Sequence, residues 1–328
     1  FAQMVEAGCE YAVMEVSSQG IKMHRTDGLY FNYAIFTNIS PDHIGPGEHA
    51  DFEEYLYYKT RLLNMCGIGL VNKDDKHAPQ IIKAANCELY TYSEEAKRLI
   101  LVASDIRYVS QPDFVGTEFH ISGKYDMEVR LGIPGLFNVV NALAAVSVCS
   151  FLGLDQARIS HALENIRVNG RMEIVYTSER CTVLVDYAHN AVSMESLLST
   201  LRDYKPKRLV CVFGCGGNRS KDRRYSMGEI GGKMADLSII TADNSRYEKV
   251  EDIIADIRGS IEKTGGKFIE IPDRREAIRY SILHAQPGDM VAVIGKGHED
   301  YQEINGVRHH FLDREVIEET VKELGEKA

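Results

Sequence analysis

The chain has 328 residues, a formal net charge of -10 and a sequence pI near 5.6. This length predicts two domains, each able to bury its own core, and the acidic balance argues against nucleic acid or an anionic membrane as a partner. Seven cysteines, an odd total with no CxxC pair, indicate a reduced and cytosolic protein. The most apolar stretch, residues 139–154, is shorter than the roughly 20 residues that span a bilayer, so we expect a buried helix there.

Apolar, β-branched runs alternate with helical patterns along the chain, which is typical of parallel sheets covered by helices on both faces. The predicted fold class is therefore α/β, with two doubly wound, mainly parallel sheets. In chain order, the predicted strands are residues 11–16, 34–39, 69–72, 183–186, 209–213, 237–241 and 290–294.

Residues 101–130 differ from this pattern because polar and apolar side chains alternate there, which predicts a small antiparallel insert. The apolar helix and a second helix over residues 159–166 follow this insert. The strand pattern then restarts at residues 168–175, and we place the domain boundary between residues 168 and 169.

Polar residues follow most of the predicted strands. Any one of them is explained as a turn former, but ligands of open parallel sheets bind outside the carboxyl ends of the strands. Together they predict a binding site at these ends. The series comprises Glu15, Asp42, His43, Asp186, His189, residues 214–217, Asp243, Asn244, Arg246 and residues 295–299.

Lys59 falls within the apolar stripe of a predicted helix, since apolar residues lie three, four or seven positions away from it. In one interpretation its stem packs and its ammonium group reaches water. In the other, burial lowers the pKa of the amine, and carbon dioxide converts the neutral amine to a carbamate. A carbamate offers oxygen ligands, so with Glu15 and His43 it could hold Mg²⁺ against phosphate.

Eight motifs spread over almost the whole chain resemble, in order, those of the Mur ligases, which are ATP-dependent amide ligases of peptidoglycan synthesis, and among them the MurE branch. The motifs are MEVSS (14–18), TNISPDH (37–43), YYKTRLL (57–63), GRMEIV (170–175), DYAHN (186–190), FGCGGNR (213–219), ADNSR (242–246) and GKGHEDYQ (295–302).

The resemblance implies an enzyme with an N-terminal UDP-binding domain, a central ATPase domain and a C-terminal Rossmann-like domain that carries the incoming amino acid. Residues 1–168 resemble a partial central domain and residues 169–328 the C-terminal domain. No GxxxxGK[ST] phosphate loop occurs in the sequence. The resemblance places that loop before Phe1, so we expect the chain by itself to be inactive.

The family's magnesium ligands match Glu15, His43 and Lys59, with the lysine as an N6-carboxylated (carbamylated) residue. These three residues are also the predicted catalytic set. Ser17 and Arg25 match residues that contact the UDP-linked substrate.

The implied cofactors are ATP and Mg²⁺. Asn138 matches a residue on the adenine side, while Arg171, Asp186 and His189 match C-terminal residues that reach the ATP. The residues alone allow simpler interpretations, in which Arg171 is a surface charge and Asp186 is the N-cap of a helix over residues 188–201.

Arg224, Asn244, Arg246, Gly295 and Glu299 match the positions that select the amino acid. A substrate with a second amino-carboxyl centre needs a cation for its distal carboxylate and an anion for its distal ammonium. Arg246 and Glu299 fit these two roles.

Diaminopimelate-adding members have DNPR at this place, and lysine-adding members generally lack the arginine. This chain has DNSR, which keeps Arg246 but puts Ser245 in place of proline. The loop loses a fixed φ and is predicted to be less constrained. Gln19 stands where many relatives have histidine, next to the expected peptide site.

The expected reaction joins meso-diaminopimelate to UDP-N-acetylmuramoyl-L-alanyl-D-glutamate through an acyl phosphate, in a cytoplasmic monomer without nucleic-acid or membrane partners. Two alternatives stay open, a ligase of the same family that adds L-lysine and a non-catalytic amino-acid-binding fragment. Folylpolyglutamate synthase would share the magnesium residues but lack the DNSR and GKGHE loops.

Overall fold

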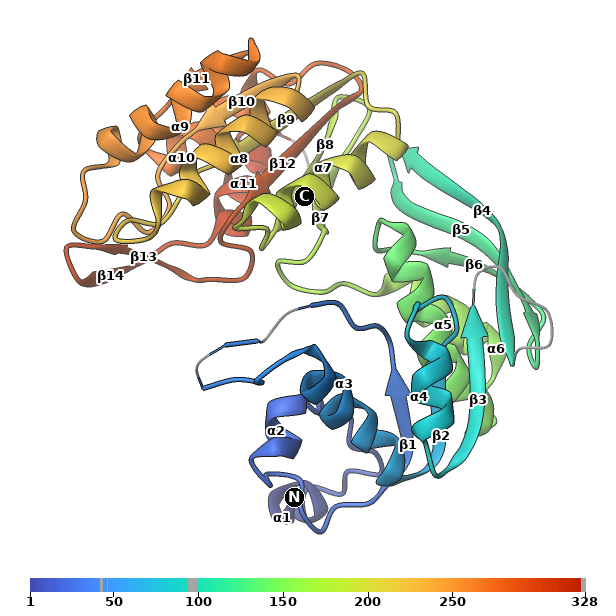
Figure 1. Ribbon diagram of the computed structural model, residues 1–328. Coiled ribbons are helices and arrows are strands. Elements are labelled where there is room, and N and C mark those ends of the chain that lie inside the picture. Colours follow the sequence, from blue (N-terminus) through green and yellow to red (C-terminus); the bar gives the residue numbers. More distant parts are fainter. Residues whose placement is uncertain (42–43, 46, 94–99, 326–328) are drawn as a thin grey trace. The chain divides into compact units, whose positions relative to one another are not determined.

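The computed structural model describes residues 1–41, 44–45, 47–93 and 100–325 (Figure 1). Contacts divide the chain into two compact units. The first comprises Phe1–Ser104, Ile121–Met127 and Val140–Gln156, and the second comprises Asp105–His120, Glu128–Val139 and Ala157–Ala328. The predicted boundary between residues 168 and 169 stays a prediction. In the part of the chain that the structure describes, no helix is both long and apolar enough to cross a membrane.

The chain up to residue 165 forms one six-stranded sheet with strand order β1-β2-β3-β4-β5-β6. β1, β2, β3 and β4 are paired in parallel, whereas connections of only two and three residues join β4 to β5 and β5 to β6, so these are hairpins. The elements are α1 (Ala2–Glu6), α2 (Ser18–Lys22), β1 (Phe31–Phe36), α3 (Phe52–Arg61), the 3₁₀ helix η1 (Leu62–Asn64), β2 (Cys66–Asn72), α4 (Ala78–Ala84), β3 (Glu88–Ser93), β4 (Leu101–Gln111), β5 (Phe114–Gly123), β6 (Met127–Leu131), α5 (Leu136–Phe151) and α6 (Gln156–Asn165).

Most predictions for this half are confirmed. β1 and β2 contain the cores of the predicted strands, β4 to β6 form the antiparallel insert, and the apolar helix is α5.

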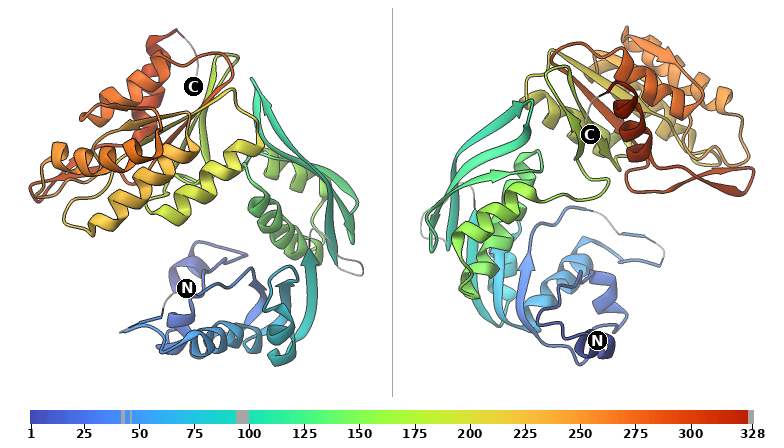
Figure 2. Two further views of the ribbon diagram at one scale, coloured as in Figure 1. Left: turned by 45° about the horizontal axis from the view of Figure 1, so that its top comes forward. Right: turned by 180° about the vertical axis from the view of Figure 1, so that it is seen from behind.

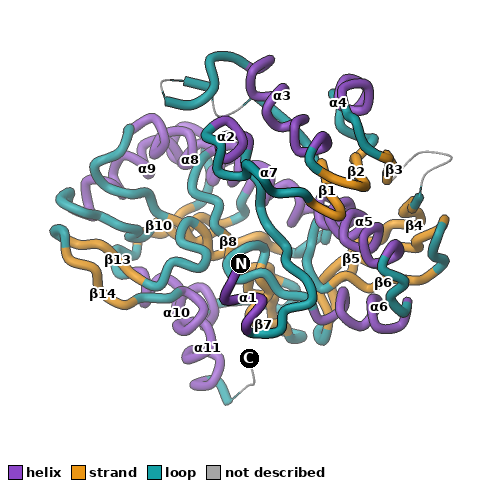
Figure 3. The backbone as a smooth tube through the Cα atoms, turned by 90° about the horizontal axis from the view of Figure 1, so that it is seen from below, coloured by secondary structure: helices purple, strands orange, loops and turns teal. Residues whose placement is uncertain are grey.

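The strand predicted at residues 11–16 is wrong. This segment is the teal loop between α1 and α2 in Figure 3, and residues 11–15 are exposed. A strand exists only as part of a hydrogen-bonded ladder, and none of the described strands pairs with these residues, since β1 ends the sheet and pairs with β2.

The rest of the chain forms a second six-stranded sheet of order β11-β10-β9-β12-β8-β7, in which only β7 is antiparallel to its neighbour. The elements are β7 (Glu173–Thr177), β8 (Cys181–Asp186), α7 (Ala191–Asp203), β9 (Arg208–Phe213), α8 (Lys221–Met234), β10 (Leu237–Ile240), α9 (Val250–Thr264), β11 (Phe268–Glu270), α10 (Arg274–Leu283), β12 (Asp289–Ile294), the hairpin β13 (Tyr301–Ile304) and β14 (Val307–His310), and α11 (Asp313–Glu323).

Helices cover both faces of this sheet (Figures 1 and 2). Successive side chains of a strand point to opposite faces, so Ala292 of β12 packs in the core beneath α7, α8 and α9, and Val291 and Val293 pack in the core beneath α10 and α11. Because both faces are buried, the central strands are apolar throughout. The predicted doubly wound arrangement is confirmed here, and the predicted strands 183–186, 209–213, 237–241 and 290–294 correspond to β8, β9, β10 and β12.

A fully buried ion pair joins α10, α11 and two strand ends. Arg274 donates from Nε and Nη2 to the Asp313 carboxylate, each at 2.7 Å. Its guanidinium also donates to the carbonyl oxygens of Ile294 at 2.9 Å and Ala242 at 3.2 Å. Ile294 is the last residue of β12, and Ala242 lies two residues after the end of β10.

Replacing Arg274 with methionine should destabilise the second unit by about 3–5 kcal/mol, because Asp313 would remain as an unpaired buried charge. Urea denaturation followed by circular dichroism measures the change. The matched control is Arg279→Met, on the same helix, which breaks an exposed pair with Glu323 and should change the midpoint little. Equal losses in both variants would contradict the special role of the buried pair.

Candidate functional site

The loops after β10 and β12, together with β13, carry a cluster of paired charges. Asn244 lies at its centre, donating through Nδ2 to Glu299 Oε2 at 3.0 Å and accepting at Oδ1 from Lys296 Nζ at 3.3 Å. Lys296 also donates to Glu299 Oε2 at 3.2 Å. Arg246 forms a second pair with Glu303 at 3.5 Å. We call Asn244, Arg246, Lys296, Glu299 and Glu303 the strand-end cluster.

The loop that carries Arg246 has serine in place of proline and is hydrogen-bonded to the β13–β14 hairpin. Arg246 has a positive φ of 51°, and its N–H donates to the Glu303 carbonyl at 2.9 Å while its own carbonyl accepts from Asn305 at 2.7 Å. Ser245 is 3% exposed. The predicted loosening of this loop relative to one with proline stays a prediction, and the hydrogen bonds to residues 303 and 305 show that the loop is tied to the β13–β14 hairpin.

Gly295 lies directly against this cluster. Its N–H donates to the Asp186 carbonyl at 3.1 Å, and its φ is 111°. A Cβ at this position would come within 3.0 Å of Asp243 Oδ2, so a side chain here would be strained and crowded.

Asp186, at the end of β8, is held by the backbone. Its carboxylate accepts hydrogen bonds from the N–H groups of Met172 and Ala188, each at 2.8 Å. Burial raises the pKa of the Asp186 carboxyl, and the two N–H donors oppose that rise. The interpretation of Asp186 as a helix N-cap is wrong, because α7 begins at residue 191 and its cap is Asn190.

Tyr187 joins the residues predicted for ATP to those predicted for the amino acid. The Arg171 guanidinium lies 4.8 Å from the centre of its ring, and the His189 ring packs edge-on against it at 4.8 Å. The Tyr187 hydroxyl donates to Glu299 Oε1 at 3.4 Å. Sequence reasoning did not select Tyr187, and it placed Lys296 only in the series of polar residues that follow strands, without a role of its own. Both stand inside recognised motifs, DYAHN and GKGHE, and that was the available signal.

Arg224 does not join the strand-end cluster through its hydrogen bonds. It is 1% exposed, and its guanidinium donates to Glu248 at 2.8 Å and Asp256 at 2.9 Å. Its role toward the amino acid stays a prediction, and these ion pairs favour a structural role that ties α8 to α9.

In the first unit, Lys59 lies on α3, whose N-terminus is capped by Asp51. Its amine donates to the Tyr55 hydroxyl at 3.4 Å and lies 5.5 Å from the ring of Tyr55 and 5.7 Å from that of Phe36. Burial lowers the pKa of the Lys59 amine, and the charge of Asp75 opposes this effect. The amine is therefore half-buried against aromatic rings and does not extend into water. Burial of this kind is what the reactive interpretation requires.

Ser17 and Lys59 are connected through buried neighbours. Ser17 caps α2 by accepting from the Gly20 N–H at 3.0 Å. The adjacent Ser18 is hydrogen-bonded to His49 Nε2 at 2.9 Å, and the His49 ring stacks on Tyr55. The residue predicted for the UDP-linked substrate thus shares a packed layer with the lysine predicted for magnesium.

The other predicted residues of this site are less constrained by their surroundings. Glu15 and Arg25 are exposed, and Asn138 donates to the Pro134 carbonyl at 2.7 Å. His43 lies outside the described residues. Among the residues that the structure describes, no group of three or more His, Cys, Asp or Glu is placed to hold a metal ion. The magnesium set therefore stays a prediction.

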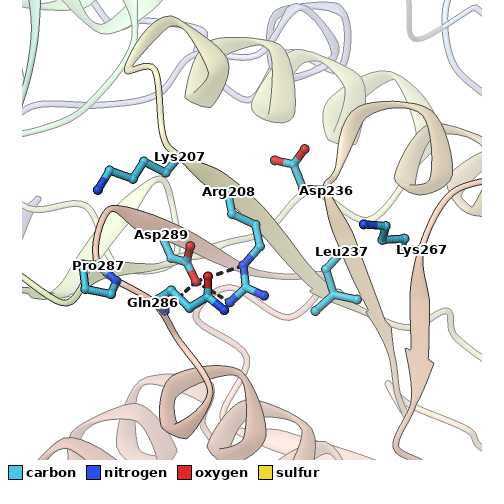
Figure 4. Close-up of a pocket in the computed structure, with 8 residues that line it drawn as sticks. All are labelled: Lys207, Arg208, Asp236, Leu237, Lys267, Gln286, Pro287 and Asp289. Carbon is cyan, nitrogen blue, oxygen red and sulfur yellow. Dashed lines mark hydrogen bonds and ion pairs between the residues drawn. The ribbon is translucent and has the colours of Figure 1, made fainter.

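A cavity of about 370 Å³ lies at the opposite edge of the second sheet (Figure 4). It is lined by residues at the amino ends of β9, β10 and β12, including Arg208, Leu237 and Asp289. Arg208 is paired with Asp289. Because ligands of parallel sheets bind at the carboxyl ends of the strands, this cavity is separate from the predicted site.

Two family models match the chain. The Mur ligase middle domain matches residues 1–149, and the Mur ligase glutamate ligase domain matches residues 170–297. Among curated proteins, the chain is 39% identical to the UDP-N-acetylmuramoyl-L-alanyl-D-glutamate--2,6-diaminopimelate ligase of Caldanaerobacter subterraneus subsp. tengcongensis, over 98% of this chain and 66% of the relative. It is 37% identical to the ligase of the same name from Clostridioides difficile, over 99% of this chain and 67% of the relative.

Solved structures agree. A structure of UDP-N-acetylmuramoyl-L-alanyl-D-glutamate--2,6-diaminopimelate ligase is similar with a TM-score of 0.74 at 33% identity, covering 98% of this chain and 66% of that chain. UDP-N-acetylmuramate-alanine ligase from Thermotoga maritima shares the fold with a TM-score of 0.61 at 18% identity, covering 90% and 60%. The chain thus spans about two thirds of the length of the relatives it matches.

A doubly wound sheet that follows another α/β sheet matches the domain order and the fold of the ligases that these comparisons identify. The chain belongs to the Mur ligase family. The two curated relatives and the solved structure at 33% identity are ligases named for 2,6-diaminopimelate.

Incubation with isotopically labelled bicarbonate should give a carbamate signal in carbon NMR that is missing from Lys59→Met. Because burial lowers the pKa of the Lys59 amine, the neutral amine forms at lower pH than that of an exposed lysine. The signal should therefore rise with pH and level off earlier. Lys83→Met, which removes an exposed lysine of α4, is the control and should keep the signal. A signal that survives in Lys59→Met would place the carbamate elsewhere.

Proposed function

We propose that the protein to which this chain belongs is an ATP-dependent amide ligase that adds meso-diaminopimelate to UDP-N-acetylmuramoyl-L-alanyl-D-glutamate. The observation that carries the proposal is the strand-end cluster, in which Glu299 is hydrogen-bonded to Asn244 and Arg246 is paired with Glu303, so that charges of both signs are present. The names of the relatives support the same substrates.

The amino acid has a distal centre with one carboxylate and one ammonium. The Arg246 side chain is 23% exposed and that of Glu299 is 21% exposed, so a ligand can reach both. Arginine binds carboxylates through two parallel N–H groups, and Glu299 accepts the ammonium. L-Lysine has no distal carboxylate and would leave Arg246 without that partner.

In the reaction, the terminal phosphoryl group of ATP is transferred to the side-chain carboxylate of the D-glutamate residue, giving an acyl phosphate and ADP. The amine of the incoming amino acid attacks the acyl carbon, the amide bond forms, and phosphate leaves with the C–O bond electrons. Positioning and charge neutralisation supply most of the catalysis in such transfers.

The residues that would hold ATP and Mg²⁺ follow from the same proposal. Mg²⁺ supplies positive charge against the phosphates when it is bound, and Glu15, His43 and carbamylated Lys59 are the proposed ligands. The half-buried Lys59 amine fits this role, because burial favours its neutral and reactive form.

On the ATP side, the proposed contacts are Asn138, Arg171, Asp186 and His189. The packing of Arg171 and His189 on Tyr187 supports this assignment, since it gathers a cation and an imidazole beside the amino-acid site. Ser17 and Arg25 are proposed to contact the UDP-linked dipeptide.

The proposal is tested by measuring phosphate release and product mass with ATP, Mg²⁺, the UDP-linked dipeptide and either meso-diaminopimelate or L-lysine. Both this chain and, where the coding sequence continues upstream of Phe1, the longer polypeptide are assayed. Product with diaminopimelate supports the proposal, and product with L-lysine alone would support the alternative ligase. Amino-acid binding without product in either polypeptide would support a non-catalytic module.

Replacing Arg246 with methionine should raise the KM for meso-diaminopimelate by roughly 10- to 100-fold, because a charge-assisted pair with the distal carboxylate is lost. The KM for L-lysine should change little. Arg258→Met serves as the control, since it removes an exposed arginine of α9 that pairs with Glu270. An equal rise of the KM for both amino acids would show that Arg246 does not bind the distal carboxylate.

A further inference from the structure

Lys296 is a fully buried lysine at the carboxyl end of β12, with 0% of its surface exposed. It stands between Gly295 and Gly297, which both have positive φ. A buried ammonium must be paired, because its transfer from water is costly. Its oxygen partners are Asn244 Oδ1 at 3.3 Å and Glu299 Oε2 at 3.2 Å, and the ring centre of Tyr301 lies 5.3 Å away.

Both oxygen partners, Asn244 and Glu299, belong to the amino-acid site of the proposed function. Glu299 Oε2 accepts from Lys296 and from Asn244, and Oε1 accepts from Tyr187 over a longer distance of 3.4 Å. The carboxylate is therefore partly neutralised and fixed in orientation before any ligand arrives. Lys296 is buried, whereas the Glu299 side chain is 21% exposed. A ligand can therefore contact Glu299 but not Lys296, and we expect Lys296 to act on the ligand by changing the charge and orientation of the Glu299 carboxylate.

We propose that Lys296 is a positioning residue that makes this site select a zwitterionic side-chain end over a lone cation. The inference rests on the proposed function, because it concerns the same amino-acid site. A ligand such as meso-diaminopimelate carries a distal carboxylate of its own, and this carboxylate balances the charge of its distal ammonium. The distal ammonium of L-lysine depends on the Glu299 carboxylate alone, and that carboxylate attracts it less because Lys296 already balances part of its charge.

The test is calorimetric titration of the 328-residue chain with meso-diaminopimelate and with L-lysine. The wild-type chain should bind diaminopimelate more tightly. In Lys296→Met the preference for diaminopimelate over lysine should fall by about tenfold, which is a modest share of the interaction between charges at such distances. Lys296→Gln keeps hydrogen-bond donors but lacks the charge, and it should show the same fall.

Two further variants separate charge from structure. In a Glu299→Gln background, Lys296→Met should leave the preference unchanged, because the carboxylate that lysine neutralises is already gone. Lys233→Met, which removes an exposed lysine of α8 paired with Glu229, should match the wild-type chain in both affinities. Circular dichroism confirms that each variant is folded.

Each outcome decides the proposal. A role in folding alone predicts that Lys296→Met weakens both ligands alike, or that Lys296→Gln behaves as wild type, and either result would overturn the inference while leaving the proposed function intact. The inference also fails if the loss of preference persists in the Glu299→Gln background. If the wild-type chain binds neither amino acid, the amino-acid site itself is wrong, and the role of Lys296 fails with it.

Discussion

The second unit depends on the buried pair between Arg274 and Asp313. With one guanidinium, Arg274 binds the carboxylate at the start of α11 and the carbonyls of Ala242 and Ile294. These carbonyls lie at or within two residues of the strand ends from which the two loops of the strand-end cluster start. A buried arginine that has lost its partner is strongly unfavourable, so helix, strands and loops are held in one arrangement. The buried guanidinium of Arg274 thus helps to fix the geometry of the strand-end cluster, although it is itself inaccessible to a ligand.

Above this pair, the parallel sheet brings distant parts of the sequence together. β8, β12, β9 and β10 are neighbours in the sheet, so the residues that follow them meet at one edge although they lie far apart in the chain. The result is a set of charges that are already paired before a ligand arrives, Lys296 with Glu299 and Arg246 with Glu303. Such a site is suited to a ligand that carries both signs of charge.

Much of this was visible in the sequence. The central strands of the second sheet were predicted to within a few residues, because strands buried on both faces read as continuous apolar runs. The same reasoning failed for residues 11–16, whose apolar composition looks like a strand but which have no partner among the described strands. Ser245 indicates only a local loss of φ restriction, and local φ preferences do not reveal the hydrogen bonds between this loop and the β13–β14 hairpin.

The sequence alone determined the fold class, the family and the positions at which polar residues end strands, since periodicity and motif order are properties of the chain itself. Only the tertiary structure decided which side chains meet. It showed that Arg224 is committed to Glu248 and Asp256, that Tyr187 links two groups of predicted site residues, and that Lys296 is buried against Glu299. Burial and pairing depend on contacts between residues remote in sequence, and no local pattern encodes them.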